Sequence, residues 1–102
     1  LINLALNYGS KSELINAINT INKKKIKINE RNIDKHLYTR GIVEPDILIR
    51  TGNTQRLSNF MLWQLEYTEI FFEKKLWPDF KVNDFKKILV KFKLRKRNFG
   101  SI

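Results

Sequence analysis

The chain has 102 residues, of which 42% are hydrophobic and 12% aromatic. This composition excludes an intrinsically disordered chain, and the length allows one modest core, because a chain of this size buries roughly 60 to 70% of its unfolded surface. The absence of cysteine excludes a disulfide framework and any thiolate metal site or nucleophile, and it predicts a reducing, cytoplasmic setting. No apolar run approaches the roughly 18 residues that would span a bilayer.

Twenty Lys and Arg residues against ten Asp and Glu give a net charge of +10. Such an excess favours polyanions, diphosphates or anionic lipid surfaces as partners. The abundance of Lys, Asn and Ile also indicates a base-composition bias, which fills solvated faces with lysine whatever the function. We therefore place more weight on individual motifs than on the total charge.

The first element in chain order is a predicted buried strand over residues 1–7. Because the chain opens inside this strand and lacks an initiator methionine, we expect a fragment or a domain of a longer protein. Ser10 and Glu13 then have the spacing of a capping box and predict the start of a helix. An apolar stripe continues that helix, and the lysines of residues 23–25 are favourable at its carboxyl end.

A second helix is predicted to begin at Asn29, a good cap, and to stop at Gly41. Ile33 and Leu37 lie one turn apart on it and should face the core. The apolar run of residues 46–50 then predicts a strand that is buried on both faces, as in a parallel sheet.

The segment 59–72 is apolar nearly all round, which predicts a buried helix or a helix running into a strand. Residues 77–80 predict a turn, and Asn83 then caps a last helix. This order favours an α/β fold with a mainly parallel sheet flanked by helices. Since two or three strands are few for such a sheet, we expect further amino-terminal strands outside this sequence and interpret residues 1–102 as a single partial domain.

Arg50, Arg56 and Ser58 form the strongest candidate site. They follow the predicted strand on the loop at its carboxyl end, where ligands bind in open α/β sheets, and guanidinium groups suit phosphate oxygens. In the alternative, Arg50 merely ends the strand, Arg56 pairs with Glu66 or Glu69, and Ser58 caps a helix. The residues alone leave both interpretations open.

Glu69 lies in apolar surroundings, where a carboxylate is costly unless it has a partner. It either pairs with an arginine or helps to hold a hard cation such as Mg²⁺ against phosphate oxygens, which needs only one or two protein carboxylates. His36 is the only histidine and is expected at the surface.

Several motifs in order resemble the cis-prenyltransferases, the undecaprenyl diphosphate synthase family. They are Asp46-Ile-Leu-Ile-Arg50-Thr, Arg56-Leu-Ser-Asn-Phe-Met-Leu-Trp-Gln64, Tyr67-Thr-Glu69-Ile-Phe-Phe and Trp77-Pro-Asp-Phe80, flanked by Asn7-Tyr8-Gly9-Ser10 and Arg95-Lys-Arg-Asn-Phe-Gly100. The match covers essentially the whole chain and corresponds to the carboxyl-terminal part of the family's domain.

The resemblance implies an enzyme that condenses isopentenyl diphosphate with an allylic diphosphate in cis geometry to make polyprenyl diphosphate. It also implies Mg²⁺ dependence, a homodimer, and a cytoplasmic location with peripheral membrane association. Carried over by motif, Arg50, Arg56, Leu57 and Ser58 would bind the diphosphate of isopentenyl diphosphate. Glu69 would be the Mg²⁺ ligand.

The chain also departs from the family. Thr51-Gly52-Asn53-Thr54 stands where the family usually has Thr-Ser-Gly-Glu or Thr-Gly-Gly-Glu, Lys11 stands where arginine is usual, and Asn98 replaces an arginine. The family's amino-terminal motif His-x-x-Gly-Asn-Gly-Arg-Trp is absent from this sequence. We therefore expect no prenyl transfer by these residues alone. A non-catalytic partner or a degenerate remnant of the family is one alternative, and a basic nucleic-acid-binding module is another, although no nucleic-acid motif is present.

Overall fold

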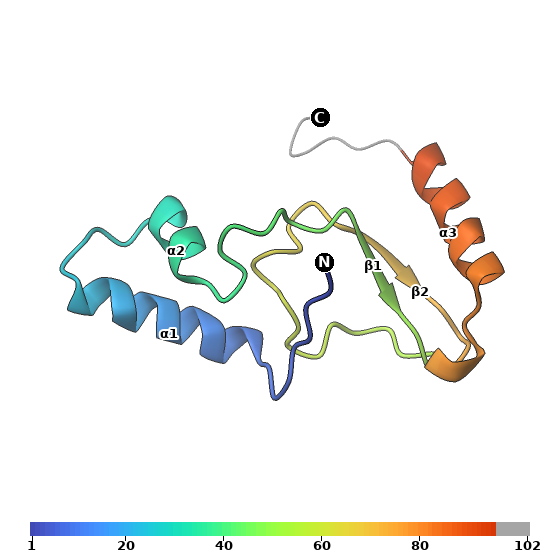
Figure 1. Cartoon of the computed structure of the whole chain (residues 1–102), viewed down its shortest axis with the longest axis horizontal. Coiled ribbons are helices and arrows are strands. Elements are labelled where there is room, and N and C mark those ends of the chain that lie inside the picture. The colour runs from blue at the N-terminus through green and yellow to red at the C-terminus, as the bar shows by residue number, and fades with distance from the viewer. Residues whose placement is uncertain (96–102) are drawn as a thin grey trace. The chain divides into compact units, whose positions relative to one another are not determined.

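The computed structural model describes residues 1–95. Its elements in chain order are α1 (Ser10–Lys23), α2 (Glu30–His36), β1 (Ile47–Arg50), β2 (Glu69–Phe72), the 3₁₀ turn η1 (Trp77–Asp79) and α3 (Val82–Leu94) (Figure 1). Asn98 and the closing motif after Arg95 lie outside the described residues.

The chain divides into two compact units. The first consists of Leu1–Val43 with Leu57–Trp63, and the second of Glu44–Arg56 with the residues from Gln64 onward. The single partial domain over residues 1–102 stays a prediction.

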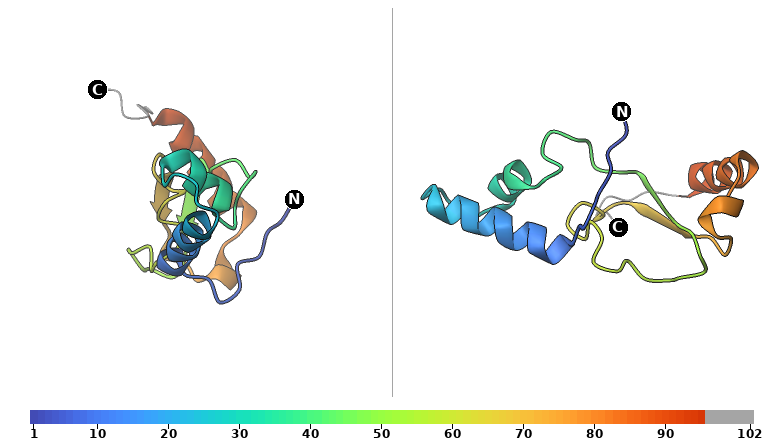
Figure 2. Two further views of the ribbon diagram at one scale, coloured as in Figure 1. Left: turned by 90° about the vertical axis from the view of Figure 1, so that its left-hand side faces the viewer. Right: turned by 60° about the horizontal axis from the view of Figure 1, so that its bottom comes forward.

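The first unit is built on α1 and α2, which lie against each other in every view (Figures 1 and 2). Their contact surface is a small apolar core of Ala17, Ile21, Ile33 and Leu37, each at most 8% exposed, against which Trp63 packs in part. The predicted stripe on α1 is confirmed at Ala17 and Ile21, whereas Ile18, part of the same stripe, is 37% exposed. Ile33 and Leu37 face the core as predicted, although Leu37 lies just beyond the end of α2. Burial of this apolar surface is the main stabilising contribution that the unit can have.

The prediction of a strand over residues 1–7 is wrong. The segment has no regular secondary structure, and the side chains of Leu1, Ile2, Leu4 and Leu6 are at least 83% exposed. The apolar character that predicted the strand is present, but a strand also needs a neighbouring strand to pair its backbone. The described first unit contains no other strand that could do so.

The predicted helix ends were right in part. Asn29 caps α2, since its Oδ1 accepts from Asn32 N at 2.8 Å. The stop at Gly41 is wrong, because α2 ends at His36. Glu13 Oε2 accepts from Tyr38 N at 2.8 Å, which takes that amide away from further helical bonding.

The second unit contains the sheet, in which β1 and β2 are parallel and pair Ile47 with Glu69 through Arg50 with Phe72. A parallel pair within an α/β arrangement was the predicted fold class, and it is confirmed. The four residues of β1 are half-buried instead of buried on both faces. The described part of this unit contains only one other strand and one long helix, which are too few to cover both faces of β1.

The segment 59–72 runs into the strand β2, as one of the two predictions had it, but the prediction of a helix before that strand is wrong. Residues 58–67 form turns and bends. The backbone is left-handed at Ser58, Asn59 and Met61, with φ of 51°, 60° and 46°. A right-handed helix cannot pass through such residues.

After β2 the chain turns through η1, where a turn was predicted, and α3 runs back along the sheet (Figures 1 and 2). Two ion pairs tie α3 to the sheet segment, Lys75 to Asp84 at 2.9 Å near the start of the helix and Arg95 to Glu69 at 3.0 Å beyond its end. The predicted cap at Asn83 is wrong. The N-cap is Lys81, whose amide donates to Asp84 Oδ2 at 2.9 Å.

Candidate functional site

The loop that leaves β1 is anchored by backbone hydrogen bonds. Arg50 O accepts from Glu73 N at 2.8 Å, Gly52 N donates to Lys75 O at 2.8 Å, and Asn53 N donates to Glu73 O at 3.1 Å. Gly52 and Asn53 turn the chain with φ of 90° and 58°. Asn53 stands where the family usually has glycine, and its backbone is left-handed. Asparagine tolerates this conformation better than most residues.

Arg50 and Arg56 lie at the two ends of this anchored loop, half-buried and exposed respectively. The ion pairs of residues 1–95 are Lys75 with Asp84 and Arg95 with Glu69, so neither of these arginines takes part in one. The alternative in which Arg56 pairs with Glu66 or Glu69 is thus wrong. Within the described residues both guanidinium groups keep their donors for another acceptor.

Leu57 and Ser58 follow Arg56 directly and belong to the first unit, where Leu57 is half-buried and Ser58 exposed. Leu57 O accepts from Phe60 N at 3.1 Å, which closes a tight turn over Ser58. No helix begins here, so the alternative role of Ser58 as a helix cap is wrong.

The turn that follows Leu57 is joined to the start of α1. Asn59 O accepts from Ser10 N at 2.8 Å, and Asn59 Oδ1 accepts from Lys11 N at 2.9 Å. Ser10 Oγ in turn accepts from Leu62 N at 3.0 Å. The predicted capping box of Ser10 with Glu13 is therefore wrong: Gly9 is the N-cap, and a distant segment satisfies the first amides of the helix.

Glu69 opens β2, and its carboxylate is half-buried. Arg95 Nη1 lies 3.0 Å from Glu69 Oε2, and the same guanidinium lies 4.0 Å from the centre of the Phe71 ring. The structure thus has the arginine partner that the sequence left as one alternative. The sequence could not name Arg95, because 26 residues separate the pair.

Residues 1–95 contain no group of three or more His, Asp or Glu side chains that could hold a metal ion by themselves. A cation held by protein ligands alone does not fit this site. A Mg²⁺ ion that keeps most of its waters and shares the oxygens of a bound diphosphate needs only one or two carboxylates, and Glu69 could supply one. None of the helices in residues 1–95 is both long and apolar enough to span a membrane.

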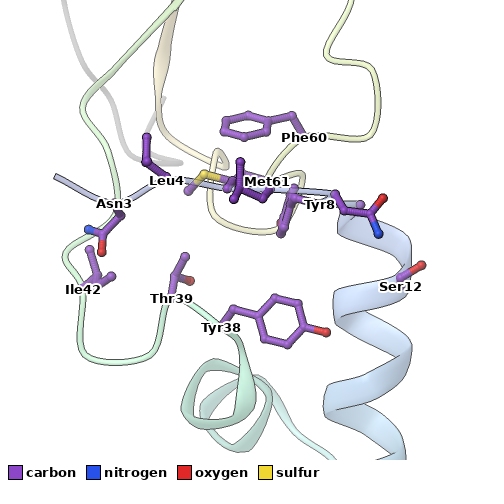
Figure 3. A pocket seen from close by; sticks show the side chains of 13 residues that line it. Asn3, Leu4, Tyr8, Ser12, Tyr38, Thr39, Ile42, Phe60 and Met61 are labelled. Carbon is purple, nitrogen blue, oxygen red and sulfur yellow. The ribbon is translucent and has the colours of Figure 1, made fainter.

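A cavity of about 410 Å³ lies in the first unit between the amino-terminal segment and residues 38–42 (Figure 3). Phe60 packs edge-on against Tyr8 with ring centres 5.6 Å apart. The lining residues include apolar, aromatic and uncharged polar side chains but no Lys, Arg, Asp or Glu. The cavity suits a hydrocarbon group and not a diphosphate. No sequence pattern pointed to this cavity, although Tyr8 and Phe60 both belong to the family motifs.

Glu13 is the buried charge of the first unit, only 1% exposed. Its carboxylate accepts from the Tyr8 hydroxyl and from Tyr38 N. Burial, together with the hydrogen bond to Glu13, raises the pKa of Tyr8 to about 12. The local sequence pattern predicted only a capping role for Glu13, and nothing in that pattern indicated that Glu13 joins three segments.

Known proteins share both the sequence and the fold of this chain. Isoprenyl transferases from Oceanobacillus iheyensis and Thermotoga maritima are 47% and 41% identical to it, over 99% and 97% of this chain and 43% and 45% of those proteins. The crystal structure of "a probable undecaprenyl diphosphate synthase" from Campylobacter jejuni matches with a TM-score of 0.88 at 40% identity, over 97% of this chain and 47% of that one.

The lavandulyl diphosphate synthase of Lavandula x intermedia, solved with dimethylallyl diphosphate, matches with a TM-score of 0.85 at 38% identity, over 95% of this chain and 45% of that one. These matches place the chain among the prenyltransferases. The family model described as "Putative undecaprenyl diphosphate synthase" matches residues 1–100, and the chain belongs to this family. It spans about half the length of the curated relatives it matches.

Proposed function

We propose that this chain supplies the isopentenyl-diphosphate-binding part of a cis-prenyltransferase that makes polyprenyl diphosphate. The observation that carries the proposal is the state of Arg50 and Arg56. Both belong to family motifs, both border the loop at the carboxyl end of a parallel strand, and neither takes part in an ion pair of the described residues. Guanidinium groups in this position suit a diphosphate.

Each proposed ligand residue has a distinct task. The two guanidinium groups bind phosphate oxygens through several donors each, and the Ser58 hydroxyl adds another donor. Leu57 contributes its backbone. The second substrate is an allylic diphosphate, in keeping with the dimethylallyl diphosphate bound to the Lavandula enzyme. We also propose a homodimer that works in the cytoplasm, with peripheral membrane contact favoured by the net charge of +10.

Glu69 is the proposed Mg²⁺ ligand. Bound Mg²⁺ would neutralise diphosphate charge, and Glu69 would contribute one oxygen to it. Arg95 now binds Oε2 of this carboxylate, so Mg²⁺ would have to share the carboxylate with the guanidinium or displace it. The substitution Glu69→Gln should therefore leave diphosphate binding without metal unchanged and abolish its increase on addition of Mg²⁺.

The test is calorimetric titration of the chain with isopentenyl diphosphate, without and with Mg²⁺. Arg50→Ala and Arg56→Ala should each weaken binding about tenfold or more, since hydrogen bonds to charged groups are the strong ones. The matched control is Arg31→Ala, which removes an exposed arginine of α2 outside the motifs. Equal losses of affinity in all three variants would show that only general charge attraction binds the diphosphate, and would contradict the proposal.

A second possibility is a non-catalytic partner or remnant of the family, favoured by Asn53 and Thr54 in the loop and by Lys11. Incorporation of radiolabelled isopentenyl diphosphate separates the two. We expect the 102-residue chain alone to bind isopentenyl diphosphate without elongating an allylic primer. Nucleic-acid binding with a steep salt dependence and no competition by diphosphate would instead favour a basic binding module.

A further inference from the structure

Asn59 makes two hydrogen bonds to consecutive amides at the start of α1. Its backbone oxygen accepts from Ser10 N at 2.8 Å, and its side-chain Oδ1 accepts from Lys11 N at 2.9 Å. The first amides of a helix have no partner within the helix. Here a residue 48 positions further along the chain from Lys11 supplies that partner, so one side chain joins the helix to the turn that carries Ser58.

The turn itself is conformationally costly. Ser58 and Asn59 are consecutive left-handed residues, with φ of 51° and 60°, and neither is glycine. Such residues persist only where surrounding contacts hold them. The Phe60 N to Leu57 O bond of 3.1 Å closes the turn locally, and the two bonds of Asn59 are what fix it to the helix.

A close approach supports the same role. A Cβ atom added at Gly9 would lie 3.0 Å from Asn59 Nδ2, so the side chain is seated directly against the backbone before α1. A second bond, from Leu62 N to Ser10 Oγ at 3.0 Å, ties the chain beyond the turn to the same helix start. This second bond offers a matched control, since it joins the same segments without bordering Ser58.

We propose that Asn59 is a positioning residue for isopentenyl diphosphate binding, which acts through Ser58 and does not touch the substrate. The inference rests on the proposed function. By fixing the left-handed turn to α1, Asn59 sets the direction of the Ser58 hydroxyl before the diphosphate arrives. Preorganisation of this kind lowers the conformational-entropy cost of binding.

The experiment measures the Kd for isopentenyl diphosphate by calorimetry, and Tm by circular dichroism, for four forms of the full chain. Asn59→Gly keeps the left-handed backbone but loses the Oδ1 acceptor, and we expect its Kd to rise about three- to tenfold, the scale of one lost hydrogen bond. Asn59→Asp keeps the acceptor but adds a negative charge beside the diphosphate site, so in high salt, where that charge is screened, it should bind within about twofold of the unsubstituted chain. Ser10→Ala loses the bond to Leu62 N and should lower the Tm without changing the Kd.

The outcomes separate the two proposals. No binding by the unsubstituted chain would overturn the proposed function and this role with it. Binding by the unsubstituted chain with an unchanged Kd in Asn59→Gly would overturn the positioning role alone, and so would an equal rise in Ser10→Ala.

Amide hydrogen exchange keeps the proposal testable if Asn59→Gly fails to fold. Saturating isopentenyl diphosphate should slow exchange at Lys11 N, because binding favours the state in which Asn59 holds that amide. Unchanged exchange at Lys11 on binding would overturn the coupling.

Discussion

Arg95, one residue beyond α3, binds Glu69 at the first position of β2, with Nη1 3.0 Å from Oε2. The Glu69 side chain is 23% exposed and that of Arg95 is 42% exposed, so water can reach the pair. Arg95 also lies 4.0 Å above the Phe71 ring. A cation therefore already neutralises part of the carboxylate charge that is proposed to attract Mg²⁺, so the pair with Arg95 opposes Mg²⁺ binding.

Arg95→Ala should strengthen the Mg²⁺-dependent part of diphosphate binding, because it removes the competing cation. Its cost in stability should be small, about 1 kcal/mol, since exposed ion pairs and cation–π contacts each contribute little. The control Lys75→Ala breaks the other ion pair in the described part of this unit, at 2.9 Å, and removes the same charge. Magnesium titration at fixed isopentenyl diphosphate, with urea unfolding in parallel, checks both. An equal gain in Lys75→Ala would mean that only the net charge matters.

The parts of the fold that local patterns determine could be predicted from the sequence. The spacing of Ala17 and Ile21 predicted the buried face of α1, and the apolar run before Arg50 predicted a strand in a parallel sheet. Both features depend on residues close in sequence. The arginines of the proposed site were chosen in the same way, from residue type and position after a strand, and their role stays a prediction.

The errors arose where distant segments decide the local structure. Residues 1–7 have the composition of a strand but have no strand beside them in the described unit. Ser58 and Met61 are left-handed although neither residue type signals it. Asn59 replaces the expected capping box through bonds to Ser10 and Lys11, which no spacing rule could foresee.

Ionisation of Tyr8 should destabilise the first unit at alkaline pH. In the unfolded chain a tyrosine ionises near pH 10, whereas burial and the Glu13 hydrogen bond raise the pKa of Tyr8 to about 12. The contribution of Tyr8 to stability is thus full below about pH 10 and is lost as the pH rises toward 12. Absorbance titration at alkaline pH should show one phenolate forming late, and Tyr8→Phe should remove that step. A late step that persists in Tyr8→Phe would assign it to another tyrosine.

Ile21 should contribute most to the core of the first unit, because it is fully buried between α1 and α2. Ile21→Ala removes buried methylene and methyl groups and leaves a cavity, which should lower the free energy of unfolding by about 2 to 5 kcal/mol. Ile15→Ala is the matched control on the same helix, since Ile15 is 60% exposed and should change stability by less than about 0.5 kcal/mol. Urea unfolding monitored by circular dichroism compares them, and similar losses would show that this core is not formed in solution.

The contact of Gly9 with Asn59 can be tested as a pair. Gly9 has extended backbone angles, φ −144° and ψ 129°, that any residue adopts, so Gly9→Ala should cost only what the 3.0 Å approach to Asn59 Nδ2 imposes. We expect a loss of about 1 kcal/mol, as in other overpacked sites, and no loss when Asn59→Gly is already present.

Gly41→Ala is the control for this cycle. Gly41 has φ of 78° and no atom within 4 Å of an added Cβ, so its cost of about 1 kcal/mol should come from the left-handed backbone alone. That cost should be the same with or without Asn59→Gly, because the two sites share no contact. Urea unfolding of the single and double variants measures both couplings. A Gly9→Ala loss that persists in the Asn59→Gly background would show that the Asn59 side chain is not seated against Gly9, and would remove one support for its positioning role.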